Sequence, residues 1–280
     1  MKQHIELSKV REFGDILSDT FLFVRQNFKP LLKTYFVICG LFLVTAMLVS
    51  ILASGQSAYD GGNSPFSFTK VLGMLFDLVN YTALMLTTLS YLALYKAKEN
   101  QPPGVVEVWS YFKYYFFRVL IVQVILGIGL TIGFFMCFIP CIYLLTVFSL
   151  VTPIMIIENG NTEYSIKRAF KIIKNNWWLT FGVILLMSII VLMVMLIFMV
   201  PAIFIFGSGQ WLTGKSFSSG YTIALSIIIH LWQVLGILPI IAVTLVYYTL
   251  TEQKEAGGLI NRIKTFGKNN TNDQFPSEQY

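Results

Sequence analysis

Residues Ile139–Gly182 read IPCIYLLTVFSLVTPIMIIENGNTEYSIKRAFKIIKNNWWLTFG, and this stretch decides the fold class of the chain. It begins as an apolar run that carries no charge before Glu158. A polar elbow and a basic amphipathic segment follow, and the chain becomes apolar again at Trp177–Trp178. An exit from a membrane, a helix on the membrane surface and a re-entry are therefore predicted within this one stretch.

The composition of the whole chain also indicates a membrane protein. Of its 280 residues, 56% are hydrophobic and only 12% are charged, whereas soluble domains carry roughly 25% charged residues. Apolar runs recur at about the 20-residue length that crosses a ~30 Å hydrocarbon core. The net charge of +6 does not indicate a nucleic-acid partner, because the basic residues lie between the apolar runs, where membrane topology places them.

We therefore expect an all-α polytopic protein with six transmembrane helices in a single membrane domain, residues 1–260. The remaining residues, 261–280, are expected to be a partly disordered cytoplasmic tail. A tight turn is expected at Ile139–Pro140, and a kink at Pro239. The six predicted spans cover residues 31–53, 70–95, 119–138, 140–157, 178–206 and 221–250.

Three amphipathic helices are predicted to lie on the membrane surface, each before a pair of spans. The first covers residues 8–30, where apolar residues recur every three or four positions and Pro30 is expected to end the helix. The second is the aromatic segment between Gly104 and Arg118. The third covers residues 162–176, with lysine and arginine on one face.

The distribution of Lys and Arg predicts the orientation in the membrane. Eighteen of the 20 lie in the N-terminal segment, the tail or the two connections on the same side, and only Lys70 and Lys215 lie opposite. The positive-inside rule then places both termini in the cytoplasm. We expect the bacterial cytoplasmic (inner) membrane as the location.

The three surface helices align with one another without gaps, which predicts a threefold internal repeat of surface helix, outward span and returning span. Convergence is the alternative, since any interfacial helix needs aromatic residues and a cation at such spacing. The matched sets, at offsets of 88 and 149, are Phe21, Val24, Arg25, Asn27 and Phe28; Trp109, Phe112, Lys113, Tyr115 and Phe116; and Phe170, Ile173, Lys174, Asn176 and Trp177.

An ordered series of residues in the central stretch carries a family resemblance: Pro140, Ile142–Tyr143–Leu144, Ser149, Pro153, Glu158, residues 165–170, Lys174, residues 176–178 and Phe181–Gly182. With this series the chain resembles the membrane domain associated with glycerophosphoryl diester phosphodiesterases and related bacterial six-span families of unassigned function. The resemblance covers residues 105–260 well and the N-terminal third loosely.

The resemblance implies a fold and a membrane location, and not a hydrolase. Those enzymes carry a soluble catalytic domain with paired carboxylates, histidine and a bound cation, and this chain shows no counterpart of it. The sequence also contains no GxSxG, HExxH or Walker-type motif. Its two histidines and three cysteines are not spaced as metal ligands. We expect no catalytic residues, no metal and no cofactor.

Five polar residues form a candidate intramembrane site. Asp77 is the only carboxylate deep in a predicted span, where a charge costs at least ~2.5–3.5 kcal/mol unless it is paired or hydrated. If the second and sixth spans pack together, the site opens outward as a substrate or proton site. The structural alternative is an interhelical hydrogen-bond network. The residues are Asp77, Asn80, Tyr81, His230 and Gln233.

Eight further residues are expected to build the elbow between the fourth and fifth spans. Glu158 is expected to pair with Lys167 or Arg168 and so fix the angle of the surface helix. Asn176 is expected to cap the next helix beside two tryptophans that anchor in the headgroup layer. The complete set is Pro140, Pro153, Glu158, Lys167, Arg168, Asn176, Trp177 and Trp178.

These features favour a non-enzymatic membrane protein that acts in envelope or lipid homeostasis by binding lipid or supporting partner proteins. The basic surface helices predict contact with anionic lipid headgroups at about 1 kcal/mol per cation. The alternative function is a small permease that uses the region of Asp77 and His230.

Overall fold

The computed structural model describes residues 5–59, 68–136, 138–213 and 219–269, and no β-strand lies among them. The chain is all-helical, as predicted. Its elements are α1 (Phe13–Tyr59), α2 (Phe68–Ala97), α3 (Val105–Met136), α4 (Phe138–Ile157), α5 (Thr162–Ile173), α6 (Trp177–Thr213), α7 (Ser219–Gln233), the 3₁₀-helix η1 (Val234–Gly236) and α8 (Ile237–Asn269).

Six helical segments of the described chain are long and apolar enough to cross a membrane, and the last of them combines α7, η1 and α8. This confirms the prediction of a multi-pass membrane protein. The six segments are Phe13–Ala53, Phe68–Ala97, Val105–Phe135, Ile139–Ile157, Trp177–Phe204 and Ile223–Glu255.

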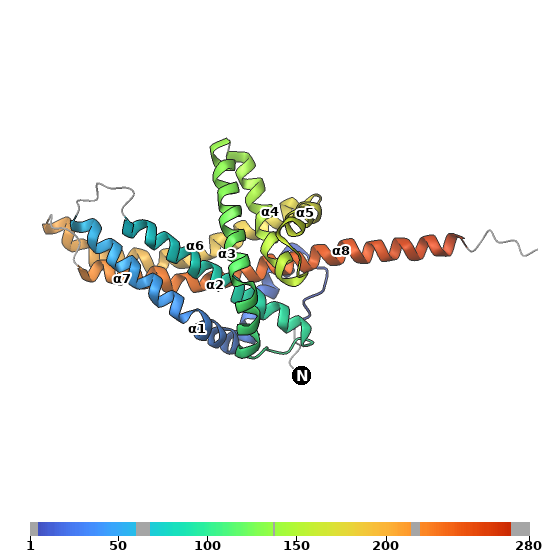
Figure 1. Cartoon of the computed structure of the whole chain (residues 1–280), viewed down its shortest axis with the longest axis horizontal. Coiled ribbons are helices and arrows are strands. Elements are labelled where there is room, and N and C mark those ends of the chain that lie inside the picture. The colour runs from blue at the N-terminus through green and yellow to red at the C-terminus, as the bar shows by residue number, and fades with distance from the viewer. Residues whose placement is uncertain (1–4, 60–67, 137, 214–218, 270–280) are drawn as a thin grey trace, which may run out of the picture.

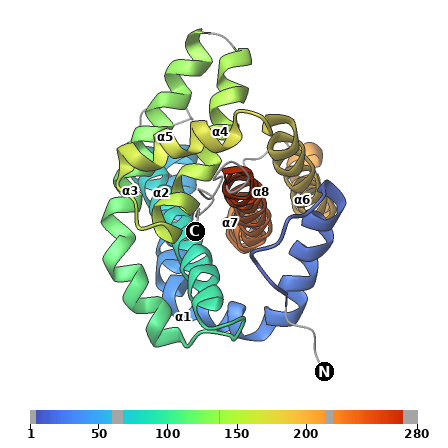
Figure 2. The ribbon, with the colours of Figure 1, turned by 90° about the vertical axis from the view of Figure 1, so that its right-hand side faces the viewer.

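The helices form three hairpins, α1–α2, α3–α4 and α6 with α7–α8, and in each the second helix is the more buried. Its most apolar stretch is 44%, 50% and 39% buried in chain order, against 22%, 22% and 17% for the first helix. Figure 2 shows α8 in the middle of the molecule, where it packs against α1, α2, α4 and α6. The first helices therefore present most of their apolar surface outward, as lipid-facing helices do.

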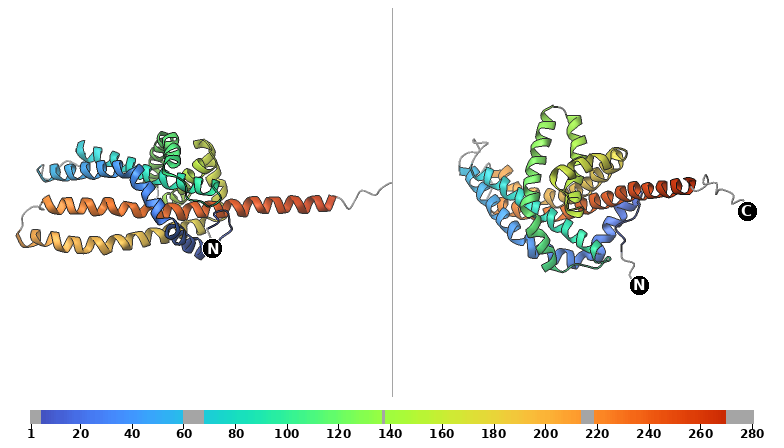
Figure 3. Two further views of the ribbon diagram at one scale, coloured as in Figure 1. Left: turned by 90° about the horizontal axis from the view of Figure 1, so that it is seen from below. Right: turned by 45° about the vertical axis from the view of Figure 1, so that its right-hand side comes forward.

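Two predicted surface helices are not separate elements. Helix α1 runs through Pro30, and α3 continues from the aromatic segment into the third span. A proline removes one backbone hydrogen bond, but the buried side chains of Asn27 and Leu31 on either side of Pro30 hold both parts of α1 in place. The proline therefore bends the helix rather than ending it, and Figure 3 shows the change of direction.

Other predicted boundaries also shift. Ile139 and Pro140 belong to the first turn of α4 instead of a tight turn. Helix α6 continues to Thr213, and α8 extends beyond the expected end of the last span at residue 250 as far as Asn269. The expected disorder of residues 270–280 lies outside the described chain. The interruption near Pro239 is η1, and two residues of α8 separate η1 from Pro239. Pro239 has no N–H to donate to the carbonyl of Leu235.

The segment before α1 is not helical, and its arginine is buried. Only 2% of Arg11 is exposed, although it falls within residues 8–30, for which the sequence predicts a surface helix. Its Nε donates to Asp19 at 2.7 Å, and its other nitrogens donate to the carbonyls of Glu6, Leu7 and Lys9. Arg11 thus fastens the N-terminal segment to α1.

The α3–α4 hairpin diverges from the other two hairpins. Figure 1 shows its far end projecting away from the bundle that contains α1, α2, α6 and α7. Its near end remains packed against α2 and α8. A cavity of about 390 Å³ lies between this hairpin and the bundle.

Candidate functional site

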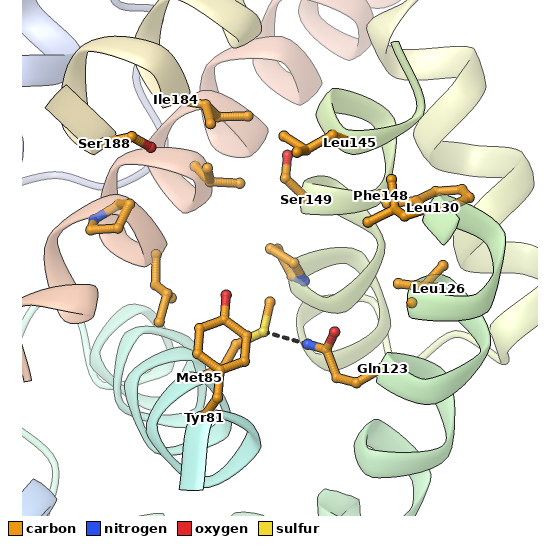
Figure 4. A pocket seen from close by; sticks show the side chains of 15 residues that line it. Tyr81, Met85, Gln123, Leu126, Leu130, Leu145, Phe148, Ser149, Ile184 and Ser188 are labelled. Carbon is orange, nitrogen blue, oxygen red and sulfur yellow. Dashed lines mark hydrogen bonds between the residues drawn. The ribbon is translucent and has the colours of Figure 1, made fainter. Parts of the chain in front are cut away.

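The large cavity, of about 390 Å³, lies between the α3–α4 hairpin and helices α2, α6 and α8. Most of its wall is apolar, formed by leucine, isoleucine, valine, phenylalanine, methionine and proline side chains. Four polar residues from four helices interrupt this wall, as Figure 4 shows: Tyr81, Gln123, Ser149 and Ser188. An apolar wall with a few separated polar groups is typical of a site for a small amphiphilic molecule.

The polar groups that line the large cavity make few strong hydrogen bonds to other groups of the described chain. Gln123 Nε2 lies 2.7 Å from the sulfur of Met85, which is a poor acceptor. No hydrogen bond of the Tyr81 hydroxyl occurs among the described residues, and the side chain is 49% exposed. Ser149 donates to the carbonyl of Thr146 at 2.8 Å and keeps its acceptor capacity. These groups therefore remain able to bind a ligand.

The small cavity, of about 280 Å³, shares Tyr81 with the large one. It lies between α2, α6 and the α7–η1 junction, and its lining includes Asn80, Trp232 and Gln233. The Trp232 indole N–H donates to the carbonyl of Val191 at 3.0 Å, which fixes the ring between α6 and α7. The two cavities thus lie on either side of one tyrosine side chain.

The predicted polar residues meet beside the small cavity. Asn80 Nδ2 donates to Gln233 Oε1 at 2.5 Å, and His230 Nε2 lies 3.6 Å from Asp77 Oδ1. The other ring nitrogen of His230 lies 2.7 Å from the carbonyl of Ser226. The structure therefore brings four of the five predicted residues together as two pairs across α2 and α7. Tyr81, the fifth, lies between the two cavities.

Two buried polar atoms of this cluster have no hydrogen-bond partner: Asn80 Oδ1 and His230 Nε2. Asn80 is 1% exposed and His230 is 2% exposed, whereas half of the Asp77 side chain is exposed. A buried polar group without a partner costs about 1–3 kcal/mol. The cluster is therefore incompletely satisfied by the protein alone.

The predicted elbow is a hydrogen-bond network centred on Glu158. One carboxylate oxygen accepts from Arg168 Nε at 3.2 Å and from the Tyr247 hydroxyl at 2.8 Å. The other accepts from the Tyr164 hydroxyl at 2.5 Å, a bond that raises the pKa of Tyr164. Of the two partners expected for Glu158, the structure selects Arg168. Lys167 pairs instead with Glu163.

The turn that follows Glu158 is held by α3. Asn159 has a positive φ of 50°, which asparagine tolerates better than most residues. Its side chain accepts from the Tyr115 hydroxyl at 2.7 Å, and Arg118 donates to the carbonyl of Gly160 at 2.6 Å. A Cβ at Gly160 would lie 2.4 Å from the Tyr164 ring, so only glycine fits there.

The remaining elbow residues have separate roles. Asn176 directly precedes α6, and its carbonyl accepts from both the N–H and the hydroxyl of Thr180. Trp177 stacks on Phe181 with ring centroids 5.0 Å apart, whereas Trp178 is 78% exposed. Pro140 is exposed near the start of α4. Pro153 lines the large cavity instead of the elbow.

Among the described residues, no group of three or more His, Cys, Asp or Glu side chains is arranged to hold a metal ion. The sequence reasoning missed Gln123, Ser188 and Trp232, which line the cavities. Each is a polar or amphipathic residue within an apolar run, and that isolation was the available signal.

A scan against models of protein families, a search of curated proteins and a search of solved structures each find no match to this chain. The expected resemblance to the phosphodiesterase-associated membrane domain therefore stays a prediction, and the assignment of the site rests on its geometry.

Proposed function

We propose that this chain is a non-enzymatic protein of the bacterial cytoplasmic membrane that binds lipid in the large cavity and acts in lipid or envelope homeostasis. The cavity carries this proposal. Its volume of about 390 Å³ falls within the ~300–1,000 Å³ range of small-molecule sites. Its wall is apolar enough for an acyl chain, and it lies beside the divergent α3–α4 hairpin.

The charge of α5 supports the same function. Its buried face contains Ser165, Ala169 and Ile172, while Lys167 and Lys171 are exposed on the opposite side. In the proposed topology this helix lies at the cytoplasmic surface. Each exposed lysine there would attract anionic headgroups by about 1 kcal/mol. Such attraction would concentrate the protein in anionic membranes, whereas the cavity would hold a particular lipid.

Lipid extraction into nanodiscs, followed by mass spectrometry of what stays bound, tests the proposal. We expect a lipid at a fixed ratio to the wild-type protein. The variant Gly127→Leu should lose it, because Gly127 lines the cavity and no atom lies within 4 Å of an added Cβ. The matched control is Gly40→Leu, an equally open glycine in α1 that lines neither cavity.

Equal lipid retention by the two glycine variants would refute binding in the large cavity. A protein partner at fixed ratio, with no bound lipid, would instead favour the role of an accessory subunit. Any such partner is outside the present structure and would have to be identified by mass spectrometry.

The proximity of Asp77 to His230 favours a second candidate function, a small permease. A half-exposed carboxylate 3.6 Å from a buried imidazole is an arrangement used in proton-linked transport. This function predicts that Asp77→Asn abolishes a transport-linked phenotype while expression and folding stay unchanged. A fully active Asp77→Asn variant would exclude it.

A further inference from the structure

The two cavities adjoin each other at Tyr81. Among the described residues, Tyr81 is the one that the two linings have in common. On α6 the large cavity contacts Ile184 and Ser188, and the small cavity contacts Val191, about one turn further along. An elongated ligand that passes Tyr81 would therefore place one end in each cavity.

The small cavity offers one donor and one acceptor from an amide pair. The hydrogen bond between Asn80 and Gln233 uses one group of each side chain. It leaves the Asn80 carbonyl oxygen, which is buried and has no partner, together with amide hydrogens of Gln233. Exchange of the oxygen and nitrogen positions in both amides again leaves one acceptor and one donor. A hydroxyl group, which donates and accepts, matches this pair.

The charges around the small cavity exclude an ionised headgroup. No Lys or Arg occurs among the described residues that line either cavity, so a phosphate or carboxylate would be buried without a counter-ion. The nearby Asp77 carboxylate would also repel an anion. An ammonium group would lack a carboxylate partner, because Asp77 lies beside His230 and does not line the cavity. An uncharged, hydroxyl-bearing end remains.

We infer that the small cavity binds the hydroxyl headgroup of an uncharged lipid, of the diacylglycerol class, through Asn80 and Gln233, while an acyl chain of the same molecule lies in the large cavity. This inference rests on the proposed lipid-binding function and adds the chemistry of the headgroup. Trp232, fixed by its own hydrogen bond, supplies an apolar wall for the glycerol carbons.

Competition binding to the full chain in phosphatidylcholine nanodiscs tests the inference. The probe is a photoactivatable diacylglycerol, and the competitors carry identical acyl chains. Unlabelled diacylglycerol should displace the probe at least ten times more effectively than phosphatidic acid or diacylglycerol methylated on its free hydroxyl. Equal competition by either analogue would overturn the hydroxyl assignment, and this comparison needs no variant.

The paired variant Asn80→Leu with Gln233→Met tests the location. Replacing both partners of a buried hydrogen bond by apolar groups of similar shape is nearly neutral for folding. We expect about tenfold weaker probe binding, as for the loss of a buried hydrogen bond to a ligand. Thr45→Val, at a polar residue of α1 that lines neither cavity, is the control and should bind the probe nearly as wild type does.

Unchanged binding in the paired variant would overturn the placement of the headgroup. The outcomes also separate the two proposals. If Gly127→Leu abolishes binding of all lipids while diacylglycerol and phosphatidic acid compete equally in the wild type, the lipid-binding function stands and the headgroup inference fails. If no lipid is retained by the wild type, the proposed function itself fails.

Discussion

The polar cluster around Glu158 and the one around Asp77 and His230 differ in how fully their hydrogen bonds are satisfied within the described chain. Glu158 receives three hydrogen bonds, and Arg168 in turn pairs with Glu255 at 2.6 Å. In the other cluster, neither His230 Nε2 nor Asn80 Oδ1 has a hydrogen-bond partner.

This difference in hydrogen bonding suggests that the Glu158 cluster stabilises the fold, whereas the cluster around Asp77 and His230 has groups left to bind a ligand. Around Glu158, α4, α5 and α8 are joined through groups that already have partners, so a ligand would have to displace protein contacts. Around Asp77, open hydrogen-bonding groups lie beside a cavity. A buried polar atom without a partner calls for an explanation, and a ligand in the adjoining cavity would supply one. The comparison is testable because matched residues occur in both clusters.

The largest expected effect is on stability at the Glu158 network. In Glu158→Ala, the largely buried Arg168 keeps only one ion-pair partner, the more exposed Glu255. We therefore expect the free energy of unfolding to fall by about 3 kcal/mol. Asp77→Ala, at a half-exposed carboxylate, should cost less than about 1 kcal/mol. Thermal unfolding in detergent, followed by circular dichroism, measures both. Equal losses would contradict the distinction between the clusters.

A smaller effect is expected from two matched tyrosines. The Tyr247 hydroxyl donates to the Glu158 carboxylate at 2.8 Å, and hydrogen bonds to charged groups contribute about 1.5 kcal/mol or more. Tyr247→Phe should therefore destabilise the protein by roughly that amount. Tyr81→Phe removes a hydroxyl without a protein partner and should leave the melting temperature unchanged while altering lipid retention. A destabilised Tyr81→Phe would show that this hydroxyl is structural.

The sequence predicted the existence of the helices better than their ends. Six apolar runs were enough to predict six spans, because the backbone N–H and C=O groups of a run in lipid must form their hydrogen bonds within a helix. Pro30 misled the prediction, since a proline within a packed helix bends it where packing holds both sides. Arg11 misled it as well, because its partners include carbonyls of the non-helical segment before α1.

The candidate site was predictable only in its local parts. Asp77 and His230 lie at similar depths in their spans, and this alone suggested that they meet. The large cavity was not predictable, because it depends on the divergence of the α3–α4 hairpin, which is set by packing between distant segments. The isolation of Gln123 and Ser188 within apolar runs could have marked them as unusual, but the sequence could not show that they line one cavity.

A weak effect is expected at the outer edge of the Glu158 network. Glu255 pairs with Arg168, but its own side chain is 60% exposed. Exposed ion pairs contribute only ~0.2–1 kcal/mol. Glu255→Gln should therefore lower the free energy of unfolding by about 0.5 kcal/mol, and high salt should weaken the effect of this variant. A loss as large as that of Glu158→Ala would mean that Glu255 belongs to the buried part of the network.

The smallest effect concerns the pair that the sequence placed differently, Lys167 with Glu163. Lys167 donates to the Glu163 carboxylate, and this hydrogen bond holds the pKa of Glu163 below its usual value. The pair therefore contributes stability above the unfolded-state pKa of glutamate and loses it as the pH falls through the lower folded-state pKa. In Lys167→Ala, carboxyl NMR should show the Glu163 pKa raised toward its ordinary value, while the melting temperature at neutral pH stays within error, because both side chains are 74% exposed. A clear loss of stability in Lys167→Ala would instead show that Lys167 contributes to the elbow. The distinction between the buried Glu158 network and the exposed Lys167–Glu163 pair would then not hold.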